Sequence, residues 1–120
     1  MIRALKAGQA VGLLPDQVPP EGLGVWAPFF GKPAYTMTLS FRLAQQTGAA
    51  ILLAWGERLP RGQGYVVHLS ELQEPLPDQA ESAAACINHA MERLILQCPG
   101  QYLWGYHRYK NPRQAGPRAG

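Results

Sequence analysis

The sequence has no long apolar run and only two cysteines. No window approaches the roughly 18 uninterrupted apolar residues that a membrane-spanning helix needs, so no segment is predicted to cross a bilayer. Cys86 and Cys98 form no CxxC pair, which argues against a zinc site and favours reduced, structural thiols. We therefore expect no bound metal.

Motifs for phosphate binding and for nucleophilic catalysis are also missing. Neither GxGxxG nor GxxxxGK[ST] occurs, so the sequence predicts no loop for a dinucleotide or a nucleoside triphosphate. No Ser/His/Asp arrangement is visible, and His68, His89 and His107 are widely scattered. We expect His68 at the surface of a strand and His89 partly packed in a helix. The residues alone indicate no catalytic group and no cofactor.

The composition is that of one globular domain with one core. The 120 residues are 47% hydrophobic and 16% charged, and 13 glycines and 11 prolines interrupt the chain without forming a repeat. The formal net charge is +3, and the last stretch contains cations but no acid: Arg108, Lys110, Arg113 and Arg118. Such a stretch either favours anionic partners, namely lipid head groups, a membrane surface or nucleic acid, or is simply a solvated terminus.

Apolar runs predict the central strands. Residues 10–14 and 49–55 are typical of strands buried on both faces, as in a parallel sheet. A helix capped by Thr36 and running to about Thr47 would join them into a right-handed βαβ unit. Residues 18–34 are predicted to form a loop. Its apolar cluster is interpreted either as a lid over the core or as the wall of a lipid-accepting cleft: Val25, Trp26, Phe29 and Phe30.

The second half predicts a strand and a long helix. Residues 65–70 alternate in polarity and predict a half-buried strand, antiparallel to the strand before it. Residues 78–98 keep a helical period, with Asp78 and Glu81 as a capping box. Residues 2–7 are typical of a helix end stopped by Gly8. The predicted fold class is α/β, with a mixed, mainly parallel sheet flanked by helices.

Two segments are candidates for binding. Asp16 follows Pro15 at the end of a predicted strand, where a carboxylate either orients a substrate hydroxyl, an Arg or a His, or caps a turn. The segment 102–110 is both aromatic and basic. Three interpretations stay open for it: stacking on nucleic-acid bases, lying at a lipid interface, or packing back on the sheet.

Several segments together resemble one family. They are Leu13–Gln17, Val25–Ala34, Leu43–Ala44 before Thr47–Ala49, and the ending Gln101–Trp104 with His107–Lys110. In this order and spacing they are similar to the lipid A biosynthesis acyltransferases, the lauroyl and myristoyl transferases of Gram-negative inner membranes. That family lies within the glycerolipid acyltransferase superfamily. The resemblance covers residues 1 to about 112.

The resemblance implies transfer of a fatty acyl group from acyl carrier protein to a hydroxyl-bearing acyl chain of a lipid A precursor. It also implies a peripheral position on the cytoplasmic face of the bacterial inner membrane, with no nucleic acid as partner. The family's catalytic dyad is a His general base followed by an acid, H-x4-D/E. No such dyad occurs in the printed sequence, because the fifth residue after each histidine is Gln73, Leu94 or Pro112.

We therefore expect residues 1–112 to be the C-terminal part of one acyltransferase domain with an incomplete fold. Its dyad would lie upstream, and the chain would be inactive alone. Residues 113–120 are expected to form a disordered basic tail. Missing elements would leave an unpaired edge open to self-association. The alternative is a small non-catalytic module that binds anionic lipid or nucleic acid through its basic, aromatic C-terminal segment.

The resemblance carries over a small set of substrate-binding residues. Asp16 matches a position implicated in the family's active-site cleft, and Gln17 adjoins it. Arg108 and Lys110, with Trp104 nearby, match the terminal motif and are expected to combine packing with contact to lipid phosphate. Arg58 is a further candidate for contact with a phosphate, or a solvated charge at a strand end.

Overall fold

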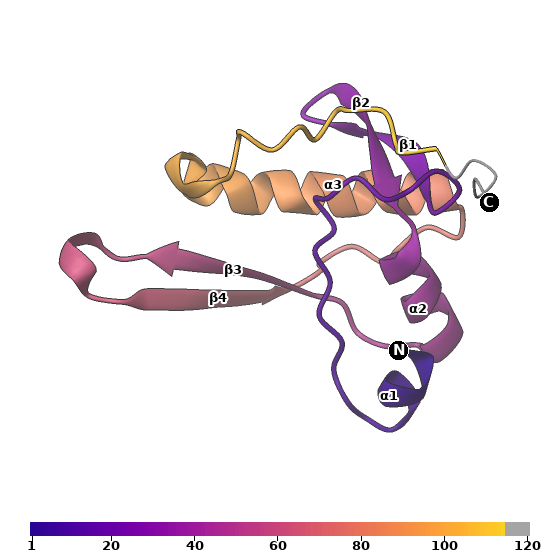
Figure 1. The fold of residues 1–120 in the computed structure, drawn as a ribbon. Helices are drawn as coiled ribbons and strands as arrows, with labels where there is room; N and C mark the ends of the chain where they lie inside the picture. The colour runs from indigo at the N-terminus through magenta and orange to yellow at the C-terminus, as the bar shows by residue number, and fades with distance from the viewer. Residues whose placement is uncertain (115–120) are drawn as a thin grey trace, which may run out of the picture.

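The computed structural model describes residues 1–114, which form two short α-helices, one long α-helix and two separate antiparallel sheets (Figure 1). The elements in chain order are α1 (Ile2–Lys6), β1 (Gly24–Phe29), β2 (Lys32–Met37), α2 (Leu39–Thr47), β3 (Leu52–Arg58), the 3-10 turn η1 (Pro60–Gly62), β4 (Tyr65–Glu71), α3 (Ala80–Gln97) and the 3-10 turn η2 (Pro99–Gln101). One sheet is the pair β1–β2 and the other is the pair β3–β4.

The prediction of a mainly parallel sheet is wrong. Residues 10–14 have no regular secondary structure, and β3 pairs with β4 alone. The predicted βαβ unit is therefore absent from the described residues. An apolar run becomes a strand only where a neighbouring strand takes up its backbone N–H and C=O groups, and here none pairs with residues 10–14.

The segment predicted as a loop, 18–34, contains most of a hairpin. β1 and β2 pair in register from Gly24 with Met37 to Phe29 with Lys32. The two residues between the strands, Phe30 and Gly31, have φ values of 50° and 78°, as a tight hairpin turn requires. Proline punctuation suggests a loop, but a two-stranded sheet consists only of edge strands, which tolerate proline.

The core lies between this hairpin and α3 (Figure 1). Phe29 from β1, Ala34 from β2 and Ile95 from α3 are buried against one another. The long helix is confirmed, although it begins at Ala80 and its N-cap residue, Gln79, makes no side-chain capping bond. The predicted capping box is therefore wrong, because Asp78 lies one residue outside the cap position.

The two shorter helices follow the sequence closely. α1 is followed by Gly8 at a φ of 81°, as predicted. α2 ends at Gly48, whose φ of 70° is left-handed, so the predicted stop is confirmed. The predicted cap at Thr36 is wrong because that residue lies within β2, and Thr38 occupies the N-cap position instead.

The β3–β4 ribbon projects beside α3 (Figure 1). Its antiparallel pairing is confirmed, from Leu52 with Glu71 at the base to Arg58 with Tyr65 at the tip. The predicted full burial of residues 49–55 is wrong, because exposed and half-buried positions alternate along β3. A ribbon with no second layer can cover only one of its faces.

Two features concern the ends of the chain and the membrane. The predicted tail, residues 113–120, falls largely on residues 115–120, which lie outside the described residues. Between residues 1 and 114, no helix is both long enough and apolar enough to cross a membrane.

Candidate functional site

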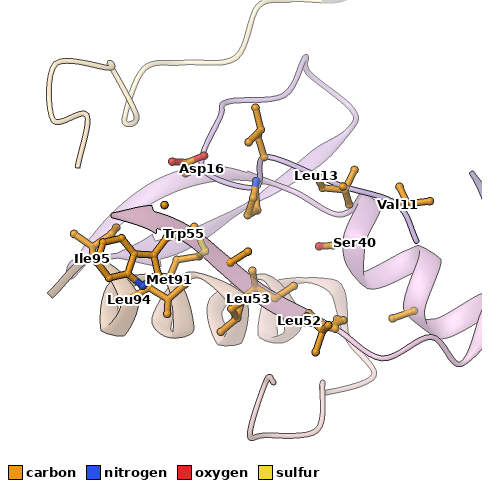
Figure 2. Close-up of a pocket in the computed structure, with 18 of the residues that line it drawn as sticks. Val11, Leu13, Asp16, Ser40, Leu52, Leu53, Trp55, Met91, Leu94 and Ile95 are labelled. Carbon is orange, nitrogen blue, oxygen red and sulfur yellow. The ribbon is translucent and has the colours of Figure 1, made fainter. Parts of the chain in front are cut away.

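An apolar cavity of about 480 Å³ lies between β3, α3 and the irregular segment 11–16 (Figure 2). That volume is within the range of small-molecule sites. Most of its labelled side chains are hydrocarbon, and they come from all three parts of the chain: Val11, Leu13, Leu52, Leu53, Trp55, Met91, Leu94 and Ile95. The two runs predicted as buried strands therefore meet here as cavity walls.

The apolar cluster of residues 25–30 was the other candidate for a lipid cleft. None of its members lines this cavity. Phe29 is instead packed in the core with an exposed fraction of 2%, and Trp26 is 45% exposed on the other strand face. The cluster therefore acts mainly as the cover of α3, which is the first of the two interpretations.

Two polar atoms are buried in the cavity wall without a hydrogen-bond partner. They are the hydroxyl oxygen of Ser40 and the indole Nε1 of Trp55. Figure 2 shows the Ser40 hydroxyl directed into the space between the segments. An unpaired buried donor raises the free energy of the folded state, so a ligand oxygen that accepts from the Trp55 N–H would be bound favourably.

A charged and polar cluster lies at another part of the wall. Asp16 and Tyr102 both line the cavity, and Arg108 lies close to them. Burial, with the negative charge of Asp16 adding to it, raises the pKa of Tyr102 to about 12. Burial lowers the pKa of Arg108, while the charges of Tyr102 and Asp16 act in the opposite direction. The cavity thus presents the Asp16 side chain beside a phenol that is protonated at neutral pH.

Arg108 is the anchor of the C-terminal segment. Its side chain is 4% exposed, and it donates from Nη1 to the carbonyl of Tyr35 at 2.7 Å and from Nη2 to Oγ1 of Thr36 at 3.0 Å. The guanidinium also lies 5.4 Å from the centre of the Phe29 ring. Packing by Arg108 is thus observed, and its predicted contact with lipid phosphate stays a prediction.

Two tyrosines attach the rest of this segment, one to the hairpin and one to the irregular segment before it. The Tyr109 hydroxyl donates to the carbonyl of Phe29 at 2.5 Å, and the Tyr106 hydroxyl accepts from the backbone N–H of Val18 at 2.8 Å. Of the three interpretations of residues 102–110, packing back on a sheet is therefore the one that these contacts show.

The remaining predicted residues lie outside the cavity wall. Gln17 is exposed next to Asp16, and Arg58 is exposed at the ribbon tip. Trp104 donates from Nε1 to the carbonyl of Pro99 at 2.7 Å, and Lys110 lies 5.5 Å above the Tyr106 ring. Only Asp16 and Arg108 come together, and they do so through Tyr102, which the sequence indicates only as part of an aromatic segment.

Two histidines have carboxylate partners, and neither histidine is itself among the residues that line the cavity. Nε2 of His68 lies 2.9 Å from Oε1 of Glu57, and the His68 ring stacks on Trp55 at 4.5 Å. The side chains of that pair are 40% and 35% exposed. Nδ1 of His89 lies 3.6 Å from Oε1 of Glu92. No group of three or more potential ligands able to hold a metal ion occurs within residues 1–114.

Comparison with known proteins places the chain beside acyltransferases. Residues 1–111 match the model of the bacterial lipid A biosynthesis acyltransferases. The chain is 34% identical to the lipid A biosynthesis lauroyltransferase of Escherichia coli K12 over 119 residues, which are 98% of this chain and 39% of that protein. It is 33% identical to the palmitoleoyltransferase of the same organism over 111 residues, 92% of this chain and 36% of that one. The chain thus spans less than two fifths of these relatives.

Proposed function

This chain belongs to the bacterial lipid A biosynthesis acyltransferase family, and we propose that it forms the C-terminal, acceptor-side portion of an acyl-transfer site. In the reaction, the hydroxyl oxygen of an acyl chain on a lipid A precursor attacks the thioester carbonyl of an acyl carrier protein. An ester bond forms, the carbon–sulfur bond breaks, and the proton of the hydroxyl reaches the departing thiolate through a base.

The apolar cavity with a polar cluster in its wall is the observation that carries this proposal. A hydrocarbon chain gains about 0.8 kcal/mol for each methylene that it buries, so walls such as Leu53 and Met91 favour an acyl chain. The carboxylate of Asp16 can accept a hydrogen bond from a hydroxyl on that chain. Tyr102, whose phenol stays protonated at neutral pH, can donate one to an ester or carbonyl oxygen.

The general base is not assigned to any residue of this chain. The sequence has no H-x4-D/E motif, and His68 and His89 are absent from the cavity wall. We propose that the chain binds the acceptor lipid but does not transfer an acyl group alone. Because that lipid is a membrane component, we also propose a peripheral position on the cytoplasmic face of the inner membrane.

Binding of a β-hydroxy fatty acid tests the acceptor role. In a Trp26→Phe/Trp104→Phe background, the fluorescence of Trp55, which lines the cavity, reports occupancy when a β-hydroxy fatty acid or the same acid without the hydroxyl is titrated into the chain. We expect the hydroxylated acid to bind at least about tenfold more tightly than the other acid, since one hydrogen bond to a charged group contributes about 1.5–3 kcal/mol net of the exchange with water.

The matched variants are Asp16→Asn and Glu21→Gln, which each remove one carboxylate charge. Asp16→Asn should erase the preference for the hydroxylated acid, while Glu21→Gln, at an exposed position outside the cavity wall, should keep it. The proposal would be contradicted if both variants preferred the hydroxylated acid equally, or if neither acid showed saturable binding to the chain.

An acyl-transfer assay tests the proposal that this chain supplies no general base. The purified chain is incubated with a labelled acyl-acyl carrier protein and a lipid A precursor, and we expect no labelled ester. Ester formation that disappears in His68→Ala would instead identify the His68–Glu57 pair as a working base.

A further inference from the structure

Two large apolar side chains protrude next to the cavity. Leu103 is 74% exposed and Trp104 is 55% exposed. They follow η2 at the C-terminal end of α3. Trp104 packs edge-on against Tyr102 at 4.8 Å between ring centres, and Tyr102 itself lines the cavity. The exposed pair is therefore continuous with the cavity wall.

The tip of the β3–β4 ribbon is tied to the same place. The side chain of Gln101 accepts from the backbone N–H of Arg58 at 2.8 Å and donates to its carbonyl at 3.0 Å. This double hydrogen bond holds the ribbon tip beside η2, although the two segments are far apart in the sequence. It brings the exposed cations Arg58 and Arg61 to the end that carries Leu103 and Trp104.

Charge is separated along the ribbon. Arg58 is at the tip, whereas Glu71 pairs with Leu52 at the base. Asp78 and Glu81 flank the start of α3, a full helix length from η2. The acid next to Arg58, Glu57, points to the opposite strand face and is paired with His68 at 2.9 Å. The ribbon tip therefore presents cations whose positive charge is not neutralised by that neighbour.

We propose that the end formed by the ribbon tip and residues 103–104, the tip face, is the surface that seats this chain on an anionic lipid bilayer. Leucine and tryptophan enter the interface between head groups and acyl chains, and the arginines pair with lipid phosphates. This inference rests on the proposed function, because it gives the acceptor lipid a direct way from the bilayer past Tyr102 into the cavity.

Vesicle sedimentation of the full chain tests the tip face. Vesicles of phosphatidylglycerol and phosphatidylcholine are compared with pure phosphatidylcholine, across a salt series. We expect partitioning only onto the anionic vesicles, weakening with salt. Arg58→Gln with Arg61→Gln should weaken it roughly 5-fold per arginine. Leu103→Ser, which removes an exposed side chain, and the double variant Leu103→Ser/Trp104→Ser should weaken it by about tenfold or more.

Each variant has a matched control at another part of the molecule. Arg3→Gln with Lys6→Gln removes two cations from α1, which lies well away from the ribbon tip in Figure 1. Leu23→Ser removes a leucine that is 50% exposed before β1. These controls should change partitioning by no more than about twofold, since they lie outside the contact surface.

The outcomes separate this inference from the proposed function. Loss confined to the tip-face variants, with fatty-acid binding in solution unchanged in Leu103→Ser, which keeps Trp104 against Tyr102, supports the tip face. Equal loss in the controls, no partitioning onto anionic vesicles, or retention of a nucleic acid in place of vesicles overturns it. If the chain binds vesicles through the tip face but does not bind the fatty acid, the result counts against the proposed function and not against the tip face.

Discussion

Two regions of this molecule differ in how fully their buried polar groups are paired. In the packed region, formed by the β1–β2 hairpin, α3 and residues 105–109, Thr36, Asn88 and Arg108 are buried at 1%, 2% and 4% exposure and bonded to one another, and Nε of Arg108 is left without a partner. In the open region, formed by residues 10–16 and the β3–β4 ribbon, the Trp55 N–H has no partner. The difference indicates that the first region supplies stability and the second supplies binding capacity.

The largest expected contrast is between two apolar deletions. Phe29→Ala should cost about 3–5 kcal/mol of unfolding free energy, because its side chain is 2% exposed in the packed region. Leu69→Ala on the ribbon, where the side chain is 66% exposed, should change it by less than about 0.5 kcal/mol. Urea denaturation measures both. Comparable losses would contradict the division into two regions.

A second contrast concerns cations of the C-terminal segment. Arg108→Ala removes two hydrogen bonds from a buried charged group, so we expect a loss of about 2–3 kcal/mol. Lys110→Ala, at an exposed position, should cost less than about 0.5 kcal/mol. Thermal and urea unfolding would test this, and a neutral Arg108→Ala would show that the segment is not anchored by that side chain.

Two glycine-to-alanine substitutions should differ by a smaller amount in their effect on stability. A Cβ on Gly24 would lie 2.5 Å from the carbonyl oxygen of Thr36, so Gly24→Ala should destabilise by about 1–3 kcal/mol as the backbone shifts. A Cβ on Gly56 meets nothing within 4 Å, and Gly56→Ala should stabilise the ribbon by up to about 0.5 kcal/mol. The comparison fails if the two substitutions have equal effects on the melting temperature.

Raising the pH should lower the unfolding free energy through Tyr102, which lies beside Asp16 in the cavity wall. The raised pKa of Tyr102, about 12 against an ordinary 10.0, means that the unfolded chain releases this proton first. The stabilisation is complete below pH 10 and is lost as the pH rises toward 12. Between these values the unfolding free energy should fall more steeply for the native chain than for Tyr102→Phe. Parallel slopes would mean that the phenol is not buried beside Asp16.

Local periodicity explains what the sequence predicts well. The long helix 80–97 and the pairing of residues 52–58 with 65–71 both follow from spacing along the chain and from the short turn between the strands. Residues 10–14 show the limit of this reasoning. Their apolar run predicts a buried strand, yet they have no strand neighbour and line a cavity.

One site residue is predictable from its place in the chain. Asp16 follows an apolar run and Pro15, matches a position of the resembled family, and lies in the cavity wall. Tyr102, Ser40 and Trp55 were missed, because their roles depend on distant segments that meet only in the folded chain. Arg108 is predicted to combine packing with contact to lipid phosphate, but the charge does not reveal its partners: its fork of donors fits the carbonyl and hydroxyl groups of β2.

Methionine methyl NMR tests the central claim, that the cavity holds an acyl chain, most directly. The chain has three methionines, and of these only Met91 lines the cavity, while Met1 and Met37 do not. On titration with a β-hydroxy fatty acid, the account predicts a saturable shift of the Met91 methyl signal, with contacts to the hydrocarbon of the ligand, and unchanged signals for Met1 and Met37. Equal shifts of all three, or a Met91 signal that does not move while the acid binds, would contradict it.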